Sequence, residues 1–184
     1  MSAEIKIKQI TELLGTGTGR GHIDMISGMV RKNPEMFMHL AQVVLHNTEP
    51  ESRKAAWVID TMTEEYPEMI QEDILVQFID LLPAACHTAL HRHILRMLDR
   101  SLIPPAKTGE LLTLCFDYLT SPDEPVAVKV HAMNIIHTMA RSEPGLLVEL
   151  TGILELRREM EPPGFRNRAV KILQSIYSKN PGTC

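Results

Sequence analysis

The chain has 184 residues, of which 44% are hydrophobic and 23% charged, and its formal net charge is −4. These values are ordinary for a soluble globular protein and exclude a disordered, collagen-like or membrane-embedded chain. The acidic balance and an aromatic content of only 4% argue against a dedicated nucleic-acid binder with a base-stacking platform.

Apolar residues recur at three- and four-residue spacing along almost the whole chain, which is the pattern of amphipathic helices. Ala55, Ile59 and Met62 share one such face. Prolines 34, 67, 104 and 144 each precede an apolar periodic run, a position that helices tolerate. The pattern predicts helices over residues 3–14, 21–32, 34–46, 50–65, 67–82, 86–101, 104–120, 123–141, 144–158 and 163–179.

Residues 4–8 are ambiguous because Glu4 to Lys8 alternate in polarity like a strand. Ile7, Ile10 and Leu13 fit a helical spacing instead. A lone strand has no pairing partner elsewhere in the chain, so the helix is the favoured interpretation.

Two markers repeat with a common period near 37 residues. One is the proline series, and the other is a basic residue at Arg20, Arg53, Arg92, Lys129 and Arg166, with apolar residues three and six positions later. One pair of amphipathic helices cannot bury both apolar faces, whereas stacked pairs form a continuous core. We therefore predict an all-α protein of five antiparallel helix pairs, stacked as a right-handed superhelix in a single domain over residues 1–184. An irregular helical bundle is the alternative.

The repeated units resemble HEAT and armadillo-type repeats. The segments SRKAAWVIDTM, VAVKVHAMNII and FRNRAVKILQSI are similar to the second helix of a HEAT unit, where small and apolar positions follow a basic residue. Asn47 and Asp123 lie six residues before a basic position, as the polar turn residue of the family does, whereas Leu14, Cys86 and Met160 depart from that pattern. The resemblance implies an α-α superhelix whose second helices line the concave side. It implies little about function.

The cysteines predict a reducing compartment. Cys86, Cys115 and Cys184 are few, odd in number and without CxxC spacing, and Cys115 is expected in the core. The first residues include acids and no signal-like apolar segment, and no run approaches 18 apolar residues. We predict a cytoplasmic protein that does not interact with membranes.

The glycine-rich stretch 15–21 could hold a phosphate on its backbone N–H groups at the start of the following helix. It fails the strict dinucleotide and P-loop motifs, and it contains no lysine. A flexible connector between the first two helices is the favoured interpretation.

His87 and His91 share a helix face, with His93 and Cys86 nearby, so a metal site is one hypothesis. A polar contact between helices is favoured, because His93 points to a different face from His91. Trp57 and Asp60 share a helix, as aromatic and acidic residues do in helical-repeat DNA glycosylases. The acidic balance argues against that activity, and Trp57 is expected to pack between repeats.

The candidate partner-binding residues are the recurring cations Arg53, Arg92, Lys129 and Arg166. Stacking would place them in a row along the inner surface, about 10 Å apart. Acceptors such as Asn47 and Asp123 could neutralise them, or an acidic partner could bind them.

We therefore expect a non-enzymatic binding or scaffold module for a protein partner, without a cofactor. No catalytic motif stands out, although triads are spatial. The alternative is a nucleic-acid or phosphate-ligand binder that uses the basic C-terminal residues Arg157, Arg158, Arg166, Arg168 and Lys171. Charged residues at both ends of the chain favour a monomer: Glu4, Lys6, Lys8, Arg168, Lys171 and Lys179.

Overall fold

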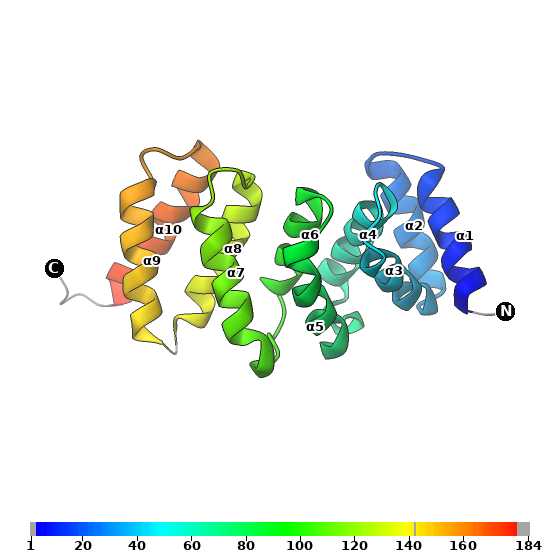
Figure 1. The fold of residues 1–184 in the computed structure, drawn as a ribbon, viewed down its shortest axis with the longest axis horizontal. Helices are drawn as coiled ribbons and strands as arrows, with labels where there is room; N and C mark the ends of the chain where they lie inside the picture. Colours follow the sequence, from blue (N-terminus) through cyan, green and yellow to red (C-terminus); the bar gives the residue numbers. More distant parts are fainter. Residues whose placement is uncertain (1–2, 142, 180–184) are drawn as a thin grey trace. The chain divides into compact units, whose positions relative to one another are not determined.

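The computed structural model describes residues 3–141 and 143–179 of the chain. Their regular structure consists of α-helices and short 3-10 turns (Figure 1). The helices are α1 (Ala3–Gly15), α2 (Arg20–Lys32), α3 (Glu35–Leu45), α4 (Glu51–Glu65), α5 (Glu72–Leu81), α6 (Thr88–Leu98), α7 (Thr108–Thr120), α8 (Val126–Met139), α9 (Pro144–Arg157) and α10 (Pro163–Lys179). The all-α prediction is confirmed, and residues 4–8 are helical as favoured.

Two helices start later than the sequence predicts. Pro67 and Pro105 each begin a 3-10 turn, Pro67–Met69 and Pro105–Lys107, and α5 and α7 start only afterwards. Between the first turn and α5, Ile70 and Gln71 adopt extended backbone. The apolar spacing continues through Met69 and Ile70, so the periodicity alone could not reveal this interruption.

Second helices pack on second helices, as a repeat requires. In the first part of the chain α2 packs against α4 and α4 against α6, while α1 packs against α3 and α3 against α5. In the second part α8 packs against both α7 and α10. The contacts gather into two compact units, unit 1 ending at Lys107 and unit 2 beginning at Thr108. The single domain over residues 1–184 and its superhelical hand stay predictions.

The buried residues are those that the helical periodicity selects. Ala55, Ile59 and Met62 are buried in α4, and Cys115 is buried in α7 as expected. Cys86 is exposed, and neither it nor Cys115 forms a disulfide bond within the described residues, whereas Cys184 lies outside them. Phe37, Phe78 and Phe165 are among the largest fully buried side chains.

A side chain early in the second helix binds a carbonyl near the end of the first in each of three pairs. His22 Nε2 donates to the Leu13 carbonyl at 3.1 Å, Ser52 Oγ to the Val43 carbonyl at 2.7 Å and His91 Nε2 to the Leu82 carbonyl at 3.2 Å. In each case the two residues are nine positions apart. The Leu13 and Leu82 carbonyls also accept a backbone N–H from three residues later, so these bonds add a contact between the two helices of a pair.

The glycine-rich turn is shaped by packing. A Cβ atom on Gly17 would lie 2.5 Å from His22 Nδ1, so only glycine allows this ring to reach the Leu13 carbonyl. Gly19 has a φ of 81°, which glycine adopts without strain. The buried Lys54 ammonium donates to the Leu14 and Gly17 carbonyls, each at 2.8 Å. The turn is thus tied to α4.

Candidate functional site

Two members of the predicted basic row lie in unit 1, near the starts of α4 and α6. Arg53 Nε donates to Glu49 at 2.9 Å, one helical turn earlier. Arg92 is exposed, and its Nη2 donates to Nε2 of the neighbouring His93 at 3.1 Å. Arg92 thus has no carboxylate among its described hydrogen-bond partners, which leaves it the most accessible cation of the row in unit 1.

The other two members lie in unit 2 and are used differently. Lys129 is buried, and its ammonium donates to Glu161 at 3.0 and 3.1 Å. Burial alone would raise the pKa of Glu161, but hydrogen bonds from Arg157 and Lys129 hold it below its ordinary value. Arg166 is exposed and donates to the backbone carbonyls of Arg158 and Glu159 at 3.2 and 3.3 Å.

Asn47 contacts the next helix pair rather than a basic residue. Its Nδ2 donates to the Ala84 carbonyl at 2.7 Å, and its Oδ1 accepts from the Cys86 N–H at 2.8 Å. Its φ of 54° is left-handed, which asparagine tolerates better than most residues. The turn residue therefore joins successive turns through backbone groups.

A cluster of charged side chains in unit 1 surrounds Asp60 of α4, which is fully buried. Oδ2 accepts from His93 Nδ1 at 2.9 Å and from Arg96 Nη1 at 3.2 Å, while Oδ1 accepts from Arg100 Nη2 at 2.8 Å. Arg96 also donates from Nη2 to both carboxylate oxygens of Glu64 at 2.8 Å. Two side chains of α6, His93 and Arg96, and Arg100 in the turn after it thus converge on one buried carboxylate of α4.

The cluster fixes the protonation of its members. Burial would raise the pKa of Asp60, but hydrogen bonds from His93 and Arg100 keep it below its ordinary value, so the carboxylate stays ionised. Burial, together with the nearby charges of Arg92 and Arg96, holds the pKa of His93 below its ordinary value, although Asp60 acts to raise it. A neutral imidazole with its proton on Nδ1 satisfies both contacts, because Nε2 then accepts from Arg92.

The cluster also builds a surface. Arg92 and Arg96 are spaced four residues apart in α6, which places them on one side of the helix. Arg100 follows in the turn after α6 and shares Asp60 with Arg96. Trp57 of α4 stacks on His93, with ring centroids 6.0 Å apart and an interplanar angle of 19°. This confirms that Trp57 packs between repeats. We call Trp57, Arg92, Arg96 and Arg100 the arginine face. Arg96 and Arg100 were absent from the predicted row, although their spacing from Arg92 was a signal.

The buried imidazole predicts a pH dependence. Since the folded state holds the pKa of His93 below 6.5, the unfolded chain binds more protons as the pH falls through that value. The free energy of unfolding should therefore decrease from pH 7.5 to pH 5.5. The groups that face His93 are Asp60, Arg92 and Arg96. Urea titrations should show a smaller decrease for His93→Gln than for wild type. An equal decrease in both would contradict this assignment.

The three histidines of the predicted cluster have separate roles. His87 Nδ1 accepts from the Ala89 N–H at 3.0 Å and caps α6, His91 binds the Leu82 carbonyl, and His93 binds Asp60. Over residues 3–141 and 143–179, no three His, Cys, Asp or Glu side chains are arranged to hold a metal ion. Nor do these residues form a helix with the length and apolar character needed to span a membrane.

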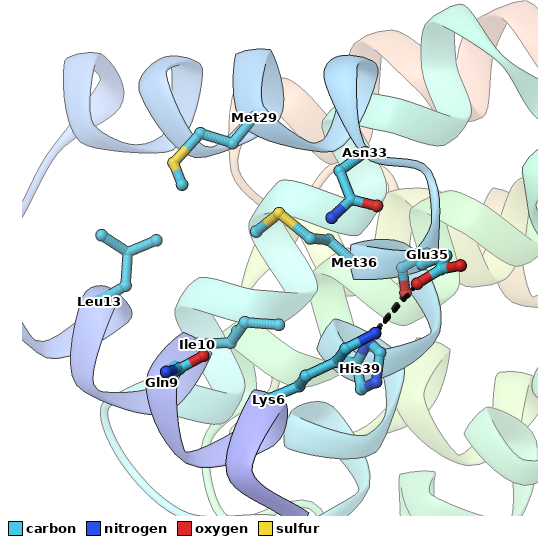
Figure 2. Close-up of a pocket in the computed structure, with 9 residues that line it drawn as sticks. All are labelled: Lys6, Gln9, Ile10, Leu13, Met29, Asn33, Glu35, Met36 and His39. Atoms are coloured by element: carbon cyan, nitrogen blue, oxygen red, sulfur yellow. Dashed lines mark hydrogen bonds and ion pairs between the residues drawn. The ribbon is translucent and has the colours of Figure 1, made fainter. Parts of the chain in front are cut away.

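A cavity of about 360 Å³ lies among α1, α2 and α3 (Figure 2). Ile10 and Leu13 of α1 face Met29 of α2, and Met36 of α3 lies between them. Lys6 and Glu35 form an ion pair of 3.0 Å at one side, which neutralises the charge there. This cavity suits an uncharged apolar group. The sequence did not indicate it, because its lining residues resemble ordinary core positions.

Residues 10–176 match the family model described as a HEAT repeat domain. The match covers most of the chain, and the stacked helix pairs have the expected architecture. The chain belongs to the HEAT repeat family. Neither the curated proteins nor the solved structures include a match to it.

Proposed function

We propose that the chain is a non-enzymatic binding module that holds an acidic segment of a protein partner on the arginine face of unit 1. HEAT repeats generally serve as scaffolds for protein interactions. In HEAT-like stacks the second helices line the concave side, and α4 and α6 are the second helices here.

The observation that carries the proposal is the anchoring of Arg96 and Arg100 by the buried Asp60. These guanidinium groups are held in place before a partner arrives, so binding costs less side-chain entropy. Their side chains remain 36% and 30% exposed, and Arg92 beside them is exposed too. Guanidinium groups bind carboxylates through paired hydrogen bonds, and Trp57 offers an adjacent apolar surface.

The alternative function, nucleic-acid or phosphate binding by the C-terminal cations, has less support. Lys129 and Arg157 both bind Glu161, and Arg168 binds Asn134. Arg157 and Arg168, two of the five C-terminal cations, thus already serve contacts within unit 2. The protein partner, the monomeric state and the cytoplasmic location remain proposals.

Replacing Arg92 with methionine tests the arginine face while keeping an apolar stem. The exposed site should tolerate the change with less than about 0.5 kcal/mol lost in unfolding free energy. Capture of the partner from an extract of the native cells should fall about tenfold. The matched control is Arg141→Met, which removes an exposed cation of unit 2.

Two outcomes would contradict the proposal. A lower melting temperature with unchanged capture would make Arg92 a structural residue. Captured nucleic acid, released steeply as salt rises from about 50 to 200 mM, would favour the alternative function. A protein partner anchored also by Trp57 should depend far less on salt.

A further inference from the structure

Helix α9 is apolar on every side, unlike the helices that bury a single stripe. Its sequence, PGLLVELTGILELR, places leucine, isoleucine and valine around the whole circumference. Such a helix is normally surrounded by other elements. In unit 2, α9 packs against α8 and α10 and buries Leu150 and Leu154. Its opposite side is not covered within the unit.

The uncovered side forms a continuous apolar ridge. Val148, Gly152 and Leu156 are spaced four residues apart and therefore share one helix face, and Met160 follows in the turn after the helix. Val148, Leu156 and Met160 are 75%, 72% and 73% exposed. A Cβ atom on Gly152 would meet nothing within 4 Å, so there is an open notch along the ridge. We call these four residues the α9 ridge.

An open groove borders the ridge on each side. One, of about 550 Å³, is lined by Leu156 and Met160 together with Ile153 and Pro122. The other, of about 590 Å³, is lined by Val148 and Gly152 together with Leu147 and Ile176. Contiguous exposed apolar surface of this kind marks an interaction site.

Two exposed acidic side chains flank the ridge, while the cations that line the groove of about 550 Å³, Lys129 and Arg157, are both paired with Glu161. Glu149 follows Val148 and Glu155 precedes Leu156, and both are exposed. The Glu155 carboxylate accepts a hydrogen bond from the Tyr177 hydroxyl. The nearby Arg157 is directed to Glu161 and to the Thr120 carbonyl instead. An apolar ridge flanked by carboxylates complements an apolar stripe flanked by cations.

The geometry points to a basic amphipathic helix of a partner protein as the occupant of the α9 ridge. Leucine-type residues at helical spacing would lie along the ridge and enter the grooves, while lysines or arginines would pair with Glu149 and Glu155. The helix hydrogen bonds of α9 occupy its own backbone, so an extended peptide would gain no main-chain pairing, whereas a helix satisfies its own groups. This surface lies in unit 2, has the opposite charge to the arginine face and does not depend on it.

The test uses a labelled, amidated peptide of about 18 residues, five helical turns, made of leucine at positions i, i+3, i+4 and i+7 and lysine elsewhere. Fluorescence anisotropy with the full chain at about 150 mM salt should show saturable binding. Leu156→Lys should weaken binding about tenfold or more, since it removes a central apolar contact and adds a repelling charge. The matched control is Leu102→Lys, at a residue of unit 1 that is 94% exposed.

A second variant tests the charge complementarity. The double substitution Glu149→Gln and Glu155→Gln should lower the affinity for the peptide severalfold. It should also make that affinity less dependent on salt, because two ion pairs are lost. A peptide of the same composition with scrambled leucine positions should bind much more weakly. Arg92→Met should leave peptide binding unchanged, so failure here and failure of the proposed function are distinguishable.

Three results would overturn the inference. The first is equal binding of the scrambled peptide, and the second is an equal loss in Leu102→Lys. The third is light scattering that gives twice the 20.7 kDa chain mass for wild type but not for Leu156→Lys. That result would assign the ridge to a second copy of the chain.

Discussion

Replacing Asp60 with alanine is expected to lower the free energy of unfolding of unit 1 by about 3 kcal/mol or more. The carboxylate is fully buried and accepts hydrogen bonds from His93, Arg96 and Arg100. Its removal leaves the buried imidazole without its acceptor and the two guanidinium groups without their shared anion. Arg96 and Arg100 can turn partly to solvent, which keeps the loss at the lower end of the range for a broken buried pair.

The only tryptophan of the chain lies inside this cluster, so fluorescence of Trp57 can follow the unfolding of unit 1 in urea. The control Asp73→Ala removes an exposed carboxylate from the start of α5 and should change stability by no more than about 0.5 kcal/mol. If Asp60→Ala loses as little unfolding free energy as Asp73→Ala, the cluster does not stabilise the contact between α4 and α6. Because Asp60 also orients the arginine face, Asp60→Ala should lose partner capture even at a temperature where it remains folded.

Replacing Glu161 with glutamine is expected to destabilise unit 2 by about 3 kcal/mol. Lys129 and Glu161 have side chains only 5% and 8% exposed, so the substitution leaves an ammonium group buried without its counter-ion. Arg157, which also binds Glu161, keeps its bond to the Thr120 carbonyl. Loss of helical circular dichroism on heating is the measurement.

A double-mutant cycle separates the pair from its surroundings. Lys129→Met should be destabilising, because it removes one of the cations that hold Glu161 ionised. The double variant Lys129→Met/Glu161→Gln should lose less unfolding free energy than the sum of the losses in the two single variants, since neither buried charge then remains. Simple additivity would show that Lys129 and Glu161 do not stabilise each other.

Local patterns predict the elements of this fold well. The three- and four-residue apolar spacing predicts the helices of the described residues, with late starts at α5 and α7, because each helix buries a face against its neighbours. The period near 37 residues predicts that second helices stack on one another, and the contacts of α4 with α2 and α6 confirm it. The interruption at Ile70 and Gln71 was not predicted, because the apolar spacing of the sequence continues through the residues where the helix is broken.

The candidate site was only partly predictable. The sequence singled out Arg92 through its place in the repeat. The anchor of Arg96 and Arg100 is Asp60, which the sequence paired only with Trp57, as a glycosylase-like feature. Its importance comes from contacts with residues 33 to 40 positions away in the chain. The α9 ridge escaped for another reason: its apolar residues resemble those of a buried helix, and only the structure shows which of them remain exposed.

The hydrogen bonds between residues nine positions apart, from a second helix to its first helix, affect how the chain folds. His22, Ser52 and His91 each close a short loop within their own pair, which costs little chain entropy. Bonds between neighbouring pairs are also modest in reach, for example 29 positions between Lys6 and Glu35 and 40 between Arg100 and Asp60. Low contact order favours fast folding, and near-neighbour coupling lets order spread from any pair that forms first. Each helix pair can therefore serve as a template for the next.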